Sequence, residues 1–74
     1  MFESRLEDVA QLTGEIDYRD AWTLNKKATD DKEFRKKVMA ALNDYDDAVA
    51  EDDQDSMDAA GKKLKELVKE CNNG

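Results

Sequence analysis

The residues with the clearest chemical character are the acidic ones between positions 44 and 58. This fifteen-residue stretch contains eight carboxylates and no lysine or arginine. They are Asp44, Asp46, Asp47, Glu51, Asp52, Asp53, Asp55 and Asp58. An uncompensated group of negative charges produces a field that steers basic partners. The stretch is therefore the first candidate for a binding surface, and the alternative is a face that is only solvated and keeps the protein soluble.

The same carboxylates do not follow the spacing of a calcium-binding loop. An EF-hand loop has glycine at its sixth position and glutamate at its twelfth. Counted from Asp52, these positions hold Met57 and Lys63. The sequence therefore predicts no specific metal site and no cofactor, and leaves open only weak, nonspecific binding of divalent ions.

Catalysis has few residues to use. The chain contains no histidine, the commonest general base in enzymes. Its single cysteine, Cys71, falls on an apolar stripe and is expected to be a buried structural thiol. No phosphate-binding loop, dinucleotide fingerprint or zinc-ligand spacing occurs. We therefore expect a protein that is not an enzyme.

Trp22 is the only tryptophan. In a small protein an indole is most often a central core residue, and we expect Trp22 to be buried. The alternative is an exposed anchor in a partner interface, where tryptophan is over-represented. The candidate partner-binding residues are therefore Trp22 and the acidic residues Asp44, Asp47, Glu51, Asp52, Asp53, Asp55 and Asp58.

Two long segments with helical periodicity flank the centre of the acidic stretch. Residues 31–50 and 54–71 each carry apolar side chains at steps of three and four, which predicts two amphipathic helices. The polar run between them favours a turn and an antiparallel hairpin over one unbroken helix. Asp30 with Glu33 forms a capping-box pattern, and either Asp53 or Asp55 is expected to cap the second helix. The stripes comprise Phe34, Val38, Ala41, Leu42, Tyr45 and Val49, and Met57, Ala60, Leu64, Leu67, Val68 and Cys71.

Shorter helices are predicted before the hairpin. Residues 2–13 have an apolar stripe that ends at Gly14, a residue suited to a left-handed helix stop. Residues 18–27 are expected to form a short helix that Asp17 caps. Residues 72–74 are expected to be frayed. The fold class is therefore all-α: a single domain over residues 1–74, built as a small bundle of three or four helices on the hairpin.

A core built from 74 residues is thin, because a domain of this size buries only about 60% of the surface of its unfolded chain. Phe2, Ile16, Leu24 and Met39 have no obvious room in one such core. Self-association would cover the surplus apolar surface. We therefore expect a homodimer.

The charge and composition restrict the classes of partner. A net charge of −7 disfavours nucleic acid as a direct partner, because phosphate binding requires a basic field. No apolar stretch approaches the roughly 18 residues that span a bilayer, so no membrane partner is expected. The start of the chain does not resemble a signal peptide, which makes a cytoplasmic location the default. A basic protein surface is the expected partner.

Three functions are consistent with these observations. The first is a small acidic protein-binding module, such as a viral or mobile-element inhibitor that mimics nucleic acid. Helix geometry places Asp44, Asp47 and Glu51 at intervals of about 4.5 to 6 Å, close to the separation of phosphates. The second is a self-associating scaffold protein with a merely solvating acidic face. The third is nucleotide or nucleic-acid binding at the opposite end of the hairpin, where lysines such as Lys36, Lys63 and Lys65 are expected to gather.

Overall fold

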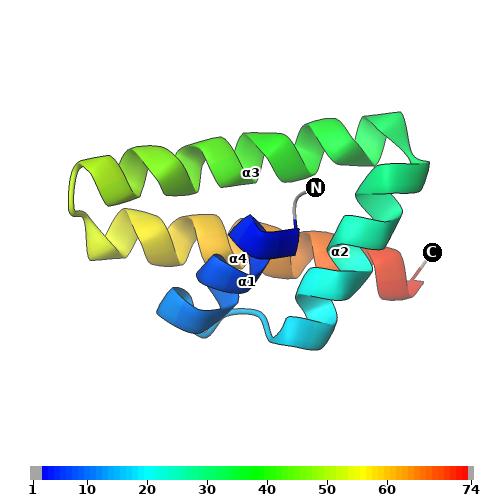
Figure 1. The fold of residues 1–74 in the computed structure, drawn as a ribbon, viewed down its shortest axis with the longest axis horizontal. Helices are drawn as coiled ribbons and strands as arrows, with labels where there is room; N and C mark the ends of the chain where they lie inside the picture. Colours follow the sequence, from blue (N-terminus) through cyan, green and yellow to red (C-terminus); the bar gives the residue numbers. More distant parts are fainter. Residues whose placement is uncertain (1–2, 74) are drawn as a thin grey trace.

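The computed structural model describes residues 3–73, which form four helices and no strand. The helices are α1 (Glu3–Thr13), α2 (Tyr18–Asp30), α3 (Lys32–Ala50) and α4 (Gln54–Asn73). The predicted all-α bundle is thus confirmed (Figure 1). In Figure 1, α3 and α4 run antiparallel and are joined by a tight turn, as the predicted hairpin requires.

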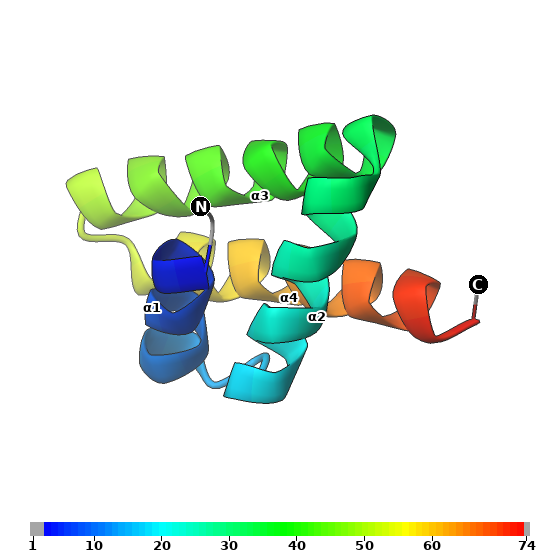
Figure 2. The ribbon, with the colours of Figure 1, turned by 45° about the vertical axis from the view of Figure 1, so that its right-hand side comes forward.

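The two N-terminal helices lie across the hairpin. Both α1 and α2 contact α3 and α4, and they also contact each other. Figure 2 shows α1 near the turn of the hairpin and α2 crossing it nearer its open end. The seam between α3 and α4 is therefore covered by the N-terminal helices.

The core draws on every helix and on the connection between α1 and α2. The residues predicted to be buried there include Phe34, Val38, Leu42, Tyr45, Leu64 and Leu67, and all six are buried. Ile16 and Leu24 are buried too, so the prediction that they lack room was wrong. Leu24 lies on the buried face of α2, and Ile16, in the connection before α2, joins the same core cluster. Met39 and Val49 remain substantially exposed. Phe2 lies outside the described residues.

The hydroxyl group of Tyr45 is an exception within this apolar core. It is buried and has no hydrogen-bond partner among residues 3–73. Burial raises the pKa of this hydroxyl above its usual value, and the nearby carboxylates of Asp8 and Asp46 raise it further. Tyr45 is therefore a neutral packing residue.

The connection between α1 and α2 follows the local sequence signals. Gly14 has a positive φ of 70°, and its N–H donates to the carbonyl of Ala10 at 3.1 Å, which ends α1. Asp17 accepts a hydrogen bond from the N–H of Asp20 at 2.8 Å, and the Asp20 side chain accepts one from the N–H of Asp17 at 3.3 Å. This reciprocal capping box fixes the start of α2.

A single residue, Asp31, joins α2 to α3. Its N–H donates to the carbonyl of Lys27 at 2.9 Å, and its carboxylate accepts from the N–H groups of Glu33 and Phe34 at 3.0 and 3.3 Å. The hydrogen bond from Phe34 lowers the pKa of Asp31 most. The cap of α3 is thus Asp31 and not Asp30. Asp30 belongs to the last turn of α2, and Asp31 is the residue with extended backbone.

The guanidinium of Arg35 reinforces this junction. It donates to the carbonyls of Ala28 at 3.0 Å and Thr29 at 3.2 Å, which would otherwise be unsatisfied at the end of α2. These bonds help to explain why α2 continues to Asp30, beyond the predicted range 18–27.

The C-terminal end of the hairpin is also longer than predicted. Residues 72–73 continue α4 instead of fraying, so that part of the prediction was wrong, and Gly74 lies outside the described residues. Leu67 and Val68 are buried within the last two turns, which anchors the end of α4.

Candidate functional site

The α3–α4 turn gathers the acidic residues through its backbone geometry. The N–H of Glu51 donates to the carbonyl of Asp47 at 3.0 Å, and the N–H of Asp52 donates to that of Val49 at 3.1 Å. Asp53 closes the turn by donating to the carbonyl of Ala48 at 3.0 Å. A turn therefore replaces the alternative of one unbroken helix.

Asp53 uses its carboxylate to begin α4. It accepts hydrogen bonds from the hydroxyl of Ser56 at 2.8 Å and from the N–H of Ser56 at 3.3 Å. These two bonds, the hydroxyl bond foremost, lower the pKa of Asp53. Asp53 is thus the helix cap, one of the two candidates from the sequence, and its carboxylate stabilises the start of α4.

Asp52 holds the strained position of the turn. Its φ of 54° is the only positive value at a non-glycine residue within residues 3–73. Because a Cβ atom is disfavoured in this region, Asp52→Gly is expected to raise the free energy of unfolding by about 0.5 to 1 kcal/mol. Urea denaturation followed by circular dichroism measures this change.

The matched control for that prediction is Asp52→Ala. It removes the same charge but keeps a Cβ atom in the left-handed region, and it is expected to lower stability. Equal stability of the two variants would show that the backbone at this position is not strained.

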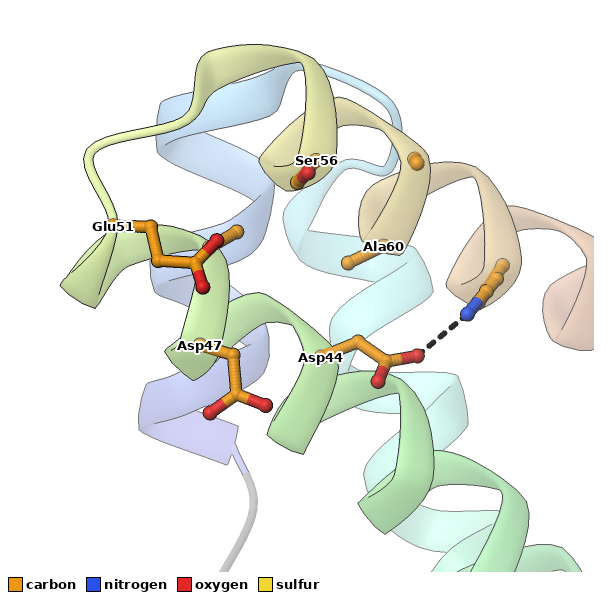
Figure 3. Close-up of a pocket in the computed structure, with 8 residues that line it drawn as sticks. Asp44, Asp47, Glu51, Ser56 and Ala60 are labelled. Atoms are coloured by element: carbon orange, nitrogen blue, oxygen red, sulfur yellow. Dashed lines mark hydrogen bonds and ion pairs between the residues drawn. The ribbon is translucent and has the colours of Figure 1, made fainter.

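A shallow groove of about 250 Å³ runs beside the turn between α3 and α4. Asp44 and Asp47 of α3 and the C-cap residue Glu51 line one side of it, and Ser56 and Ala60 of α4 line the other. Figure 3 shows the Asp44 carboxylate directed toward α4 and the Asp47 carboxylate directed away from it. The groove is therefore acidic on the α3 side and small and uncharged along most of the α4 side.

Two of the eight carboxylates have a basic partner in space. Lys63 Nζ lies 2.5 Å from Asp44 Oδ2 at one end of the groove, and Arg5 of α1 forms an ion pair with Asp46. The sequence placed Lys63 with the basic end of the hairpin, and this was wrong because Lys63 lies opposite the middle of α3. The row of Asp44, Asp47 and Glu51 that was predicted to mimic phosphates therefore has one neutralised member.

The remaining carboxylates divide by what they contact. Asp53 caps α4, and Asp58 accepts a hydrogen bond from the side-chain amide of Gln54 at 3.0 Å. Four side chains are exposed and have no hydrogen bond or ion pair among the described residues. We call Asp47, Glu51, Asp52 and Asp55 the free acidic set.

The free acidic set is not explained by helix stability. Asp47 and Glu51 lie at the C-terminal end of α3, where the helix dipole disfavours negative charge, and the last turn of α3 contains no basic residue. Asp55 lies in the first turn of α4, where negative charge is favourable. At least two of the four carboxylates, Asp47 and Glu51, therefore lower the stability of the helix that positions them.

Trp22 lies apart from the acidic residues, and the prediction that it is buried was wrong. Its side chain is 55% exposed. The buried face of α2 consists of Ala21, Leu24 and Ala28. Because two of these side chains are small, α2 packs closely on the hairpin, and this face leaves no room for an indole. Lys26 covers part of the indole, with Nζ 5.2 Å from the ring centroid.

A second groove, of about 240 Å³, adjoins Trp22. It is lined by Trp22, Thr23, Lys26, Lys27, Asp30 and Cys71. Because Cys71 is near the C-terminal end of α4 and the turn precedes its N-terminal end, the two grooves lie at opposite ends of this helix. Cys71 is partly buried, and burial raises the pKa of its thiol, so the thiol is protonated at neutral pH.

The basic end of the hairpin is partly compensated. Lys37 lies 3.3 Å from Glu70, an ion pair between α3 and α4. Lys36 pairs with Glu33 at 3.7 Å, and Lys69 pairs with Glu66 at 3.5 Å. These exposed pairs reduce the field that a phosphate group would meet there.

Residues 3–73 show neither a metal-binding cluster nor a membrane-spanning helix. No group of three or more acidic or cysteine side chains in this range is arranged to hold a metal ion. None of the helices there has both the length and the apolar character needed to cross a membrane.

Comparisons with protein-family models, with curated proteins and with solved structures found no match for this chain. Its function is therefore inferred from the two surfaces described above.

Proposed function

We propose that this protein is a small, non-enzymatic binding module whose acidic end engages a basic protein surface. The observation that carries the proposal is the free acidic set, four exposed carboxylates without a basic partner among the described residues. Glu51, Asp52 and Asp55 border one shallow depression, and Asp47 and Glu51 line the groove beside it. The set thus forms one continuous acidic surface at the tip of the hairpin.

The chemistry of this surface favours a partner rich in lysine or arginine. Exposed carboxylates attract such a partner over about 8 to 10 Å at physiological salt and raise the rate of association. The net charge of −7 adds to this attraction at longer range.

The partner class we favour is the nucleic-acid-binding surface of another protein. Asp47 and Glu51 are one helical turn apart, about 6 Å along α3, which is near the spacing of successive phosphates. With Asp44 neutralised by Lys63, the mimicry extends over these two residues and continues into the turn. An inhibitor of this type, as carried by phages or mobile elements, would compete with DNA or RNA for its target.

The test uses poly-L-lysine carrying a fluorescently labelled DNA duplex. We expect the protein to displace the DNA, with an affinity that falls steeply as salt increases. Replacing the free acidic set together (Asp47→Asn, Glu51→Gln, Asp52→Asn and Asp55→Asn) should weaken the affinity by roughly fourfold to several hundredfold, since each exposed pair contributes about 0.2 to 1 kcal/mol. Circular dichroism should show an intact helical fold.

The matched control neutralises four carboxylates elsewhere: Glu3→Gln, Glu7→Gln, Asp8→Asn and Asp30→Asn. The control has the same net charge as the test variant. A loss of affinity seen only in the test variant would therefore show that binding depends on the acidic tip and not on the total charge. Equal affinities for the two variants would show that the acidic tip only solvates the protein. The tip would then be expected to gain slight stability on neutralisation, through relief of like-charge repulsion.

A further inference from the structure

Helix α2 presents an aromatic surface that the fold does not use. Tyr18 is 61% exposed and Trp22 is 55% exposed, and the two lie one helical turn apart. The groove beside Trp22 extends to Cys71 on α4. Large aromatic side chains exposed together on a small protein mark an interaction surface more often than a solvated one.

The charge of α2 distinguishes it from the rest of the molecule. Residues 17–30 contain three basic and three acidic side chains, a net charge of zero, in a chain whose net charge is −7. They are Arg19, Lys26, Lys27, Asp17, Asp20 and Asp30. Two copies of an acidic protein repel each other through most of their surfaces, and this repulsion is smallest where α2 meets α2.

The order of side chains on the exposed face of α2 is self-complementary. Tyr18 precedes Trp22 by four residues, and Lys26 follows it by the same interval, so the three lie on one face of the helix. In an antiparallel pair of α2 helices centred on Trp22, Tyr18 of one copy therefore opposes the partner's Lys26, which brings a cation to a second aromatic ring. Antiparallel helix dipoles add a favourable term.

We propose that the exposed face of α2 is the docking site for a second copy of this chain, in a two-fold symmetric dimer with Trp22 at its centre. A two-fold interface uses the same patch on both copies, and the patch must be complementary to itself, as this one is. The groove beside Trp22 provides space for a side chain of the second copy. Lys26 already covers the indole, and it exchanges this contact for the partner's Tyr18.

The arrangement leaves the acidic tip of each copy free. Trp22 adjoins Cys71 near one end of α4, and the α3–α4 turn precedes the other end. The dimer therefore has two acidic tips facing away from the shared α2 surface. This inference does not depend on the proposed function, because it concerns a different surface and needs no other partner.

The test measures mass and the environment of the single tryptophan over a range of concentrations. Sedimentation velocity should give twice the monomer mass of 8.4 kDa at high micromolar concentration. Tryptophan emission should shift to shorter wavelength as the dimer forms, since Trp22 is the only tryptophan and leaves water. Trp22→Gln should weaken dimerisation more than about tenfold, as expected for a central aromatic anchor.

Val49→Gln is the matched control. Val49 is 47% exposed and lies beside the α3–α4 turn, so its replacement should leave the dimer intact. The variant without the free acidic set should also remain dimeric, which separates this inference from the acidic binding surface. A mass of 8.4 kDa at every concentration, or a Trp22→Gln dimer as tight as the wild type, would overturn the proposal, and so would a dimer that Val49→Gln disrupts instead.

Discussion

Leu64→Ala is expected to lower the free energy of unfolding by about 2 to 5 kcal/mol and to leave much of the protein unfolded at moderate temperature. Leu64 is fully buried on the face of α4 that packs against α3, the most extensive helix pair in the molecule. A 74-residue domain has a total stability of only about 4 to 11 kcal/mol. The loss of one central leucine is therefore a large part of the total, and Leu42→Ala, at an equally buried position on α3, should behave alike.

Thermal denaturation followed by circular dichroism measures the effect, and Leu12→Ala supplies the control. Leu12 is 60% exposed on α1, so removing its side chain should change stability by no more than about 0.5 kcal/mol. An unchanged melting temperature for Leu64→Ala would mean that the apolar stripe of α4 does not face the core.

Gly61→Val is expected to destabilise the protein by about 3 kcal/mol, although glycine is a poor helix former. A Cβ atom at Gly61 would lie 2.8 Å from the hydroxyl oxygen of Thr13 and 3.1 Å from two side-chain carbons of Glu15. The hydroxyl is held in place, because it donates to the carbonyl of Val9 at 2.7 Å and accepts from the N–H of Glu15 at 3.3 Å. The end of α1 thus packs directly on the backbone of α4.

Ala59→Val separates this steric effect from the low helix propensity of valine. Ala59 is an exposed residue of the same helix, where valine should cost only about 0.5 kcal/mol. Gly61→Val and Ala59→Val should therefore differ by more than 2 kcal/mol. Similar melting temperatures would show that α1 does not pack against Gly61 in solution.

The helices and most of their ends could be predicted because the signals that specify them are local. Apolar steps of three and four specified α3 and α4, and Gly14 and Asp17 specified the α1–α2 connection. The cap of α3 was misplaced by one residue because Asp30, with Glu33 three positions later, fits a capping box, whereas the actual cap, Asp31, is followed at that distance by Phe34. Only the extended backbone of Asp31 decides between them.

The surface charges could not be predicted, because their partners are distant in the sequence. Arg5 and Asp46 are 41 positions apart, and Lys63 and Asp44 are 19 apart. No periodicity relates such pairs, so the acidic stretch was treated as uncompensated throughout. Its free part is smaller than predicted and is confined to the tip of the hairpin.

The exposure of Trp22 had a local signal that was outweighed by the size of the indole. Ala21, Leu24 and Ala28 follow one another at steps of three and four, which describes a buried stripe that excludes Trp22. A stripe containing two alanines contributes little apolar area. The larger apolar area of the indole therefore favoured Trp22 as the core residue, although the close packing of α2 excludes it.

The one-residue junction at Asp31 restricts the angle between α2 and α3. Its backbone ends one helix and its side chain begins the next, and Arg35 ties the last carbonyls of α2 to α3. There is no slack chain at this corner to absorb a change of angle. The aromatic face of α2 and the acidic tip beyond α3 are therefore carried on two arms of a single stiff part. The angle between α2 and α3 therefore sets the direction of one surface relative to the other.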